Sequence, residues 1–141
     1  MTGMVRRDEV VVGRALAELR VQVDAQAMKP MALLLRDPNP IHLDPAVVEA
    51  LGFGDRVINQ GPLNAAYIWD MLVRTWGDAA RVRQLDLRYT SNALAGDELV
   101  VGGEITEVDP DTGTATCAVW LRRDDGRDVV TGRATVEAEE V

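Results

Sequence analysis

The sequence predicts an α+β fold, with an antiparallel β-sheet wrapped around a long central helix. Hydrophobic residues follow a helical period in the first half of the chain and a period of two from residue 80 onward. One expected helix, residues 62–76, is long and apolar enough to cover a face of the sheet. A chain of 141 residues suits one hydrophobic core, so residues 1–141 are interpreted as a single domain.

A strand and a short helix are expected first. Residues 19–23 are predicted as a strand. A helix follows and ends before Pro38 and Pro40, because proline disrupts a helix interior. It is indicated by apolar residues at steps of three and four, namely Ala27, Met28, Met31, Leu34 and Leu35.

Two more helices are expected before the sheet. Asp44-Pro45 is typical of a helix start, and Gly52 is placed to end this second helix. Its expected buried residues are Val47, Val48 and Leu51. The longer helix, residues 62–76, has apolar residues on nearly every side, which predicts that it is buried all round.

The second half of the chain predicts four strands. Apolar and polar residues alternate there, and the separators are rich in glycine, aspartate and other turn formers. An antiparallel meander is therefore expected, with strands near residues 81–91, 98–108, 114–123 and 128–138.

Composition excludes several classes of function. The chain has 15 basic and 23 acidic residues, and its formal net charge of −8 repels nucleic-acid backbones. One cysteine, Cys117, and one histidine, His42, supply neither an internal disulfide nor a Cys/His zinc set, so no metal is expected. Lys29 is the only lysine, which disfavours Schiff-base chemistry.

The sequence also indicates a location. It contains no run of the ~20 apolar residues that a membrane helix needs. Asp8, Glu9 and Arg14 interrupt any apolar core of a signal peptide near the first residue. The protein is therefore expected in the cytoplasm, with no membrane partner.

Residues 37–42 are the strongest candidate for chemistry. They read Asp-Pro-Asn-Pro-Ile-His, so two prolines stiffen a loop that holds a carboxylate and an imidazole. Groups held in fixed relation favour acid/base chemistry on a water or a proton. The alternative is an ordinary turn between two helices, with Asp37 as a cap and His42 in solvent.

A second candidate is the entry to the long helix, at Gly61. The first amide groups of a helix lack partners inside it, and the helix dipole attracts a negative oxygen there. Glycine also lets a ligand approach the backbone. The alternative is a plain helix start, with Pro62 at the first helical position.

These residues resemble a known family. Residues 37–42, followed by Asp44, resemble the D-x-N-P-x-H motif of the MaoC-like (R)-specific enoyl-CoA hydratases, which have the hot-dog fold. Gly61 falls where those proteins begin their central helix. The resemblance spans about residues 19–136. It implies a hydratase or dehydratase that interconverts a trans-2-enoyl thioester and a 3-hydroxyacyl thioester without metal or redox cofactor, with the coenzyme A thioester as substrate.

The resemblance also assigns roles. It implies that Asp37 and His42 jointly hold the reacting water, that Asn39 fixes the loop, and that the Gly61 N–H stabilises the thioester oxygen as negative charge develops. Which of the two acid/base groups takes the proton from water stays open.

Several positions depart from the family pattern and indicate a modified pocket. Arg36 replaces a small residue, and Val48 lies where alanine or serine is usual. Gln60-Gly61-Pro62 replaces histidine-glycine-methionine. Arg36 is expected to pair with Asp37, to meet a coenzyme A phosphate or to face solvent. With Arg36, the residues expected at the substrate are Asn39, Gln60 and Pro62.

Two other functions stay open. One is a subunit of a heteromeric MaoC-like hydratase that binds a bulky acyl-CoA, such as a steroid side chain, although the intact motif favours activity. The other is a hot-dog thioesterase, with Asp70 as its carboxylate. Asp70 lies about two turns from Gly61 at ~5.4 Å per turn, which is poorly placed. It is expected to pair with Arg74 instead.

A homodimer at least is expected, because hot-dog domains commonly join sheets edge to edge, which also covers an open edge strand. Pairing with a related hot-dog chain is the alternative. Trp120 alternates with buried positions, so it is predicted on the outer face of the sheet, where it suggests a partner surface.

Overall fold

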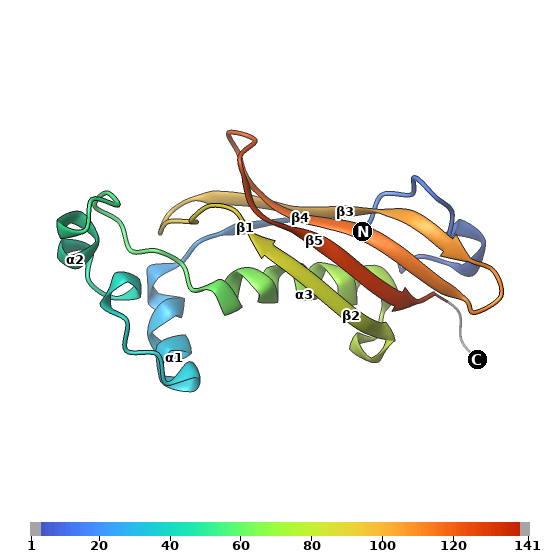
Figure 1. Ribbon diagram of the computed structural model, residues 1–141, viewed down its shortest axis with the longest axis horizontal. Helices are drawn as coiled ribbons and strands as arrows, with labels where there is room; N and C mark the ends of the chain where they lie inside the picture. Colours follow the sequence, from blue (N-terminus) through green and yellow to red (C-terminus); the bar gives the residue numbers. More distant parts are fainter. Residues whose placement is uncertain (1–3, 139–141) are drawn as a thin grey trace.

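A five-stranded antiparallel sheet curves over one long helix (Figure 1). The computed structural model describes residues 4–138. The strands are β1 (Leu19–Gln22), β2 (Val82–Tyr89), β3 (Glu98–Asp109), β4 (Thr114–Arg123) and β5 (Asp128–Glu137). Helix α3 (Gly61–Trp76) lies along the concave face and begins one residue earlier than expected. The predicted α+β class, with a sheet wrapped on a central helix, is confirmed.

The expected meander of four strands is wrong at its first connection. The strand order is β1-β3-β4-β5-β2, so β2 pairs with β5 at one edge and does not contact β3 as a hairpin partner. The segment between β2 and β3 pairs with the chain before α3 instead. The Asn59 N–H donates to the Ala93 carbonyl at 2.8 Å, and the Ala95 N–H donates to the Val57 carbonyl at 2.9 Å. Turn-forming residues indicate where a strand ends, but they do not indicate which strand it pairs with in the sheet.

The smaller helices lie mostly beyond one end of the sheet (Figure 1). At that end lie α1 (Ala25–Leu35), the 3₁₀ turn η2 (Pro40–His42) and α2 (Pro45–Ala50), whereas the 3₁₀ turns η1 (Arg7–Glu9) and η3 (Ala79–Arg81) lie toward the other end. The capping role of Asp44 is confirmed, because its carboxylate accepts the Ala46 N–H at 2.9 Å. Leu34 is 78% exposed and Leu51 57% exposed, so the expected burial of Leu51 is wrong. Within residues 4–138, α1 and α2 each bury one side, with Met28 and Val48 fully buried, and leave residues such as Leu34 and Leu51 uncovered.

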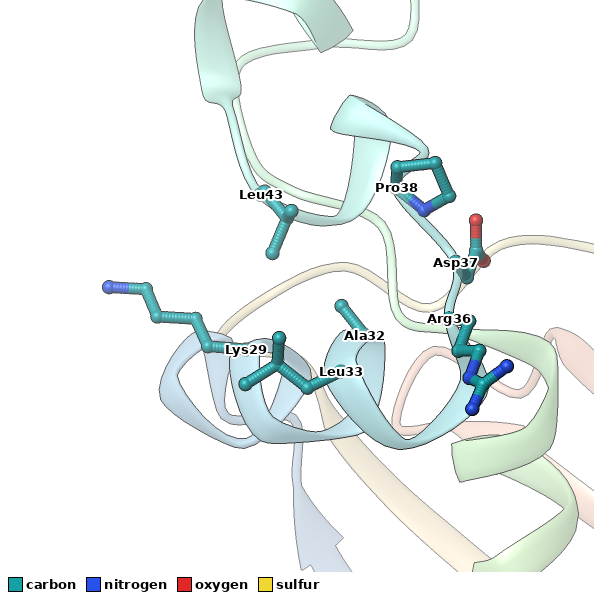
Figure 2. Close-up of a pocket in the computed structure, with 7 residues that line it drawn as sticks. All are labelled: Lys29, Ala32, Leu33, Arg36, Asp37, Pro38 and Leu43. Carbon is teal, nitrogen blue, oxygen red and sulfur yellow. The ribbon is translucent and has the colours of Figure 1, made fainter.

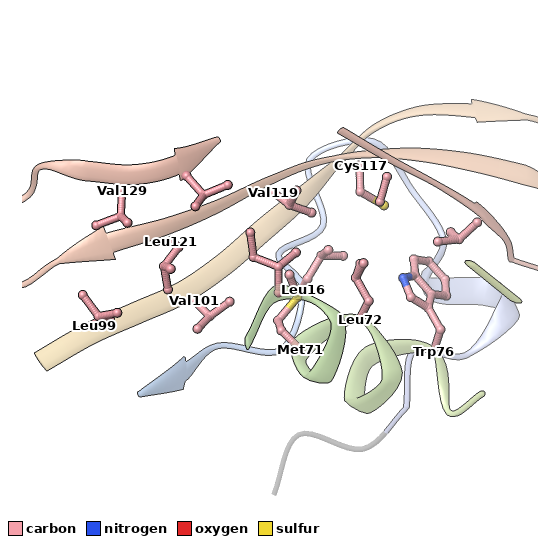
Figure 3. Packing of buried hydrophobic residues seen from close by; sticks show 14 of the residues in the cluster. Leu16, Met71, Leu72, Trp76, Leu99, Val101, Cys117, Val119, Leu121 and Val129 are labelled. Carbon is pink, nitrogen blue, oxygen red and sulfur yellow. The ribbon is translucent and has the colours of Figure 1, made fainter. Parts of the chain in front are cut away.

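Helix α3 is buried on one side, and the expectation of burial all round is wrong. The sheet covers only the face whose residues are Asn64, Ile68, Met71, Leu72, Thr75 and Trp76. Trp69, on another side, is 39% exposed. Figure 3 shows Met71, Leu72 and Trp76 pointing from the helix toward the sheet, with Met71 near Val101 and Trp76 on the side of Cys117. This packing holds the helix at a fixed position under the strands.

Trp120 lies on the outer face of β4, as predicted. Its neighbours Val119 and Leu121 are buried against the core, whereas Trp120 is half-buried. The Arg122 guanidinium lies 4.4 Å from the centre of the indole ring, a cation–π contact. Within residues 4–138, no helix is both long and apolar enough to cross a bilayer.

Gly132→Ala should destabilise the fold, because a Cβ at this position of β5 collides with the backbone of β2. It would meet the Asp86 carbonyl oxygen and lie 2.8 Å from Leu87 Cδ2. Overpacking against a backbone that cannot rotate away costs about 1–3 kcal/mol. We expect a matching loss in the free energy of unfolding, measured by urea denaturation. Thr131→Ala, on the same strand, is the control, and equal stability of both variants would contradict the prediction.

Candidate active site

The end of helix α1 places Asp37. Arg36 ends the helix in the left-handed conformation, with φ of 52°. The Asp37 N–H then donates to the Ala32 carbonyl at 3.0 Å, so the chain turns sharply and stays attached to the helix. Asp37 Oδ1 accepts the Asn39 N–H at 3.0 Å, and Oδ2 takes no part in this contact. One carboxylate oxygen is therefore structural and the other is available.

Asn39 fixes the middle of the loop. Its Oδ1 accepts the Ile41 N–H at 3.2 Å and caps the 3₁₀ turn η2, which begins at Pro40. This side-chain hydrogen bond and the two proline rings hold Asp37 and His42 at the two ends of a short, stiff segment. The observed role of the Asn39 side chain is therefore to hold the backbone of its own loop.

His42 is buried at the end of this loop, with its side chain 10% exposed. Its Nδ1 lies 2.6 Å from the Ile58 carbonyl oxygen, and its Nε2 lies 3.6 Å from Asp37 Oδ2. The alternative of a histidine in solvent is therefore wrong. A separation of 3.6 Å is longer than a direct hydrogen bond, and one small molecule that contacts both atoms can bridge it.

The hydrogen bond at Nδ1 determines what Nε2 can do. A carbonyl oxygen can only accept, so Nδ1 carries the proton in this contact. In the neutral imidazole, Nε2 then has a free lone pair, and it faces the carboxylate. The Asp37–His42 pair thus presents two proton acceptors at one point, which suits the two hydrogens of one water molecule.

The segment before α3 joins this pair to the helix entry. The Ile58 N–H donates to the Ile41 carbonyl at 3.0 Å, beside the contact between His42 and the Ile58 carbonyl. Three residues later Gly61 begins α3. Within residues 4–138 no backbone acceptor takes the Gly61 N–H, which lies at the positive end of a 16-residue helix.

The other predicted substrate residues take different positions. The Gln60 side chain is fully buried, and its Nε2 donates to the Met28 carbonyl at 3.0 Å, so it holds α3 to α1. Pro62 is exposed in the first turn of α3. Arg36 makes no ion pair with Asp37 in the described part of the chain and lies at the rim of a groove. Contact of these three residues with substrate stays a prediction.

An apolar groove of about 700 Å³ opens beside Asp37. It runs between α1 and the segment after η2, and Figure 2 shows Leu43 pointing across it toward Ala32 and Leu33. Lys29 and Arg36 carry positive charge along the same helix. The groove therefore suits a ligand with an apolar chain and an anionic portion.

Two residues at the helix entry were not singled out from the sequence. The Tyr89 hydroxyl, at the end of β2, donates to the Gly61 carbonyl at 3.1 Å. The Asn64 side chain is buried and accepts a hydrogen bond from the Asn59 side chain at 2.7 Å. A polar residue in the first turn of an apolar helix was the signal for Asn64. No local pattern places Tyr89, because only the sheet brings β2 to Gly61.

The other nucleophilic candidates lie away from this site. Asp70 is exposed and pairs with Arg74 at 3.2 Å, as expected. Cys117 is buried in β4, and burial raises the pKa of its thiol to about 12. A thiol with such a pKa supplies almost no thiolate near neutral pH. The Asp37–His42 pair and the Gly61 N–H therefore stay the candidate reactive groups of this site.

The sheet curved over α3, with a D-x-N-P-x-H loop beside the helix entry, defines a hot-dog domain that carries a hydratase motif. The sequence model of the family described as "MaoC like domain" matches residues 9–137. The chain belongs to this family of MaoC-like hydratases and dehydratases. No curated protein sequence matches the chain.

Solved structures agree with this assignment. R-hydratase PhaJ1 from Pseudomonas aeruginosa, unliganded, is 27% identical, with a TM-score of 0.86 over 98% of this chain and 88% of that one. The (R)-hydratase from A. caviae involved in PHA biosynthesis is 28% identical, with a TM-score of 0.83 over 92% and 97%. The ChsH1-ChsH2 complex from Mycobacterium tuberculosis contains a chain 25% identical, with a TM-score of 0.77 over 89% and 96%.

Proposed function

We propose that this protein adds water to a trans-2-enoyl thioester to give a 3-hydroxyacyl thioester, or catalyses the reverse reaction. The observation that carries the proposal is the Asp37–His42 pair, with Nε2 and Oδ2 3.6 Å apart and the histidine tautomer set by Ile58. The family and its (R)-hydratase relatives support the same reaction class. The substrate is proposed as a coenzyme A thioester, and the reaction needs no cofactor beyond it.

The reaction follows from the three groups at the site. A water molecule ~2.8 Å from both Nε2 and Oδ2 donates one hydrogen to each, so its oxygen lone pair is free to attack. The oxygen bonds to the β-carbon of the enoyl group, and one of the two acceptors takes the proton that water loses. The π electrons of the C=C bond shift to form a double bond between the α-carbon and the carbonyl carbon, and the π electrons of the C=O bond move onto the thioester oxygen. The Asp37–His42 pair then returns one proton to the α-carbon, and the C=O bond re-forms.

The Gly61 N–H is proposed to stabilise the negative charge on the thioester oxygen. It lies at the N-terminus of α3, where the helix dipole is positive. A donor aimed at such a charge contributes typically ~100- to 1000-fold in rate. The groove beside Asp37 is proposed to hold the apolar chain of the thioester substrate. Lys29 and Arg36, which line the same groove, are proposed to meet the phosphate groups of its coenzyme A portion.

An assay on enoyl-CoA substrates tests the proposal. Purified protein is mixed with crotonyl-CoA, with an enoyl-CoA of medium chain length and with a bulky polycyclic enoyl-CoA, and the loss of enoyl absorbance is followed. Hydration of any of these supports the function. An acyl-CoA thioesterase assay runs in parallel, and free thiol released without loss of the enoyl group would contradict it.

The assembly is proposed as a homodimer, with a related chain as the alternative partner. β2 and β1 are the two edge strands of the sheet, and α3 keeps an uncovered side. Relatedness to a chain of the ChsH1-ChsH2 complex favours testing a partner chain as well. Sedimentation of the purified protein distinguishes monomer from dimer, and activity that appears only with a second chain would favour the heteromeric alternative.

Gly61→Ala should lower activity without unfolding the protein. A Cβ at this position would lie 3.5 Å from Tyr89 Cε1, an ordinary contact, and φ of Gly61 is not in the left-handed region. The added methyl group stands beside the N–H and impedes the thioester oxygen. We expect kcat/KM to fall by roughly tenfold or more. The loss should stay smaller than the ~100- to 1000-fold that removal of the donor itself costs, because the N–H is still present. Wild-type kcat/KM in a variant with normal Tm would contradict this role.

A further inference from the structure

Two buried asparagines connect the peptide that holds His42 to the peptide that carries the Gly61 N–H. Asn59 and Asn64 are each 3% exposed. The Asn59 Nδ2 donates to the Asn64 Oδ1 at 2.7 Å, and this hydrogen bond spans the turn where α3 begins. We call it the asparagine clamp.

The first peptide in the clamp joins Ile58 and Asn59. Its carbonyl accepts the hydrogen bond from His42 Nδ1 at 2.6 Å, and its N–H donates to the Ala93 carbonyl at 2.8 Å. A rotation of this peptide would move the carbonyl that holds the imidazole. The orientation of His42 therefore depends on the position of the Asn59 backbone.

The second peptide joins Gln60 and Gly61. Its carbonyl accepts the Asn64 backbone N–H at 3.1 Å, and its N–H is the proposed oxyanion donor. Because the N–H and C=O of a trans peptide point in opposite directions, this bond sets the direction of the Gly61 N–H. Asn64 thus holds the second peptide directly through its backbone N–H and reaches the first one only through the side chain of Asn59.

The composition of the clamp favours a role in positioning over one in stability. Asn59 Oδ1 is buried and accepts no hydrogen bond in the described part of the chain, while the same side chain also interacts with the Tyr67 hydroxyl. An unpartnered buried acceptor lowers the stability of the fold, a cost that an apolar side chain at this position would avoid. Asn64 likewise occupies the buried face of α3 that otherwise packs Ile68, Met71 and Leu72. Polar groups thus stand where apolar packing would serve stability, and their hydrogen bond fixes the geometry of the turn.

We infer that Asn59 and Asn64 are positioning residues that set the proton-transfer pair and the oxyanion donor in register. The inference rests on the proposed hydration reaction. Neither residue is assigned contact with the substrate, so loss of the clamp should reduce kcat far more than it changes KM. Misplacement of a reacting group by about 1 Å costs up to ~100-fold in rate.

Asn64→Leu removes the acceptor, and Asn64→Asp keeps one. We expect kcat for enoyl-CoA hydration to fall roughly 10- to 100-fold in Asn64→Leu, with KM within about threefold of wild type, and to be largely restored in Asn64→Asp. Thr75→Val is the matched control, because Thr75 is also a buried polar residue of α3, bonded to the Met71 carbonyl at 2.8 Å. It should lower Tm and leave kcat unchanged.

A second readout separates geometry from stability. The enolate form of a 3-ketoacyl-CoA resembles the charge that develops at the thioester oxygen, and its binding is followed by ultraviolet absorbance. Asn64→Leu should weaken enolate binding by about the factor lost in kcat, while a saturated acyl-CoA keeps its affinity. A role in folding alone would lower Tm without separating these two ligands.

The outcomes are distinguishable. An active wild type whose Asn64→Leu variant keeps full kcat and enolate affinity overturns the positioning role and leaves the proposed function intact. A wild type inactive on every enoyl-CoA overturns both. If Asn64→Leu does not fold, Asn59→Ala removes the donor from the other end, and the same kcat loss is expected; full kcat in that variant overturns the inference.

Discussion

His42→Ala is expected to lower kcat/KM for enoyl-CoA hydration by about 100- to 10,000-fold, the range for a general acid/base group. The side chain is 10% exposed, is anchored at 2.6 Å to the Ile58 carbonyl and presents Nε2 to Asp37. Alanine supplies no proton acceptor at that point. The loss of enoyl absorbance measures the rate, and circular dichroism checks that the variant is folded.

Imidazole in the buffer provides a control for the role of His42. Removing the ring leaves a buried space beside the Ile58 carbonyl, into which free imidazole fits, and partial recovery of the rate is expected. A folded His42→Ala variant within tenfold of wild type would contradict the assignment of this residue and, with it, the proposed mechanism.

Asp37→Asn should have an effect of the same order, ~100-fold or more. Asparagine keeps an oxygen for the Asn39 N–H, which Asp37 Oδ1 accepts at 3.0 Å, so the loop is preserved. The oxygen that faces His42 is replaced by an NH₂ group, which accepts no proton. The change therefore removes the chemistry of the carboxylate and leaves its structural role in place.

Asp44→Asn is the matched control for this variant. Asp44 also accepts the backbone N–H two residues ahead, at 2.9 Å, and it caps α2 outside the site. Asparagine is as good an N-cap as aspartate, so both activity and Tm should stay near wild type. Equal activity of the Asp37→Asn and Asp44→Asn variants would show that the Asp37 carboxylate takes no part in the reaction.

Local chemistry explains why much of the architecture was predictable. The alternation of β3, β4 and β5 and the helical period of α3 are visible in short windows of sequence, as is the Asp44-Pro45 start of α2. Burial was less predictable. Leu51 and Trp69 are apolar yet exposed, because the sheet of one chain covers a single side of α3 and leaves α1 and α2 uncovered.

The candidate site shows the same division. Residues 37–42 carry their own rigidity in the sequence, since prolines and short polar side chains fix the backbone locally. The partner of His42 was not readable there, because the Ile58 carbonyl is 16 residues away and is a backbone group that any residue type supplies. Tyr89 reaches Gly61 across 28 residues only through the sheet.

Neighbouring residues account for the α+β class, the order and type of the main helices and strands, the D-x-N-P-x-H loop and the glycine that opens α3, so a reading of the sequence alone recovers them. The tertiary structure decided the position of β2 beside β5, the one-sided cover of α3, the tautomer of His42 and the asparagine clamp. Each of these depends on which distant backbone groups meet. Pairing among distant groups is set by the packing of the whole chain, so it cannot be predicted from local sequence patterns.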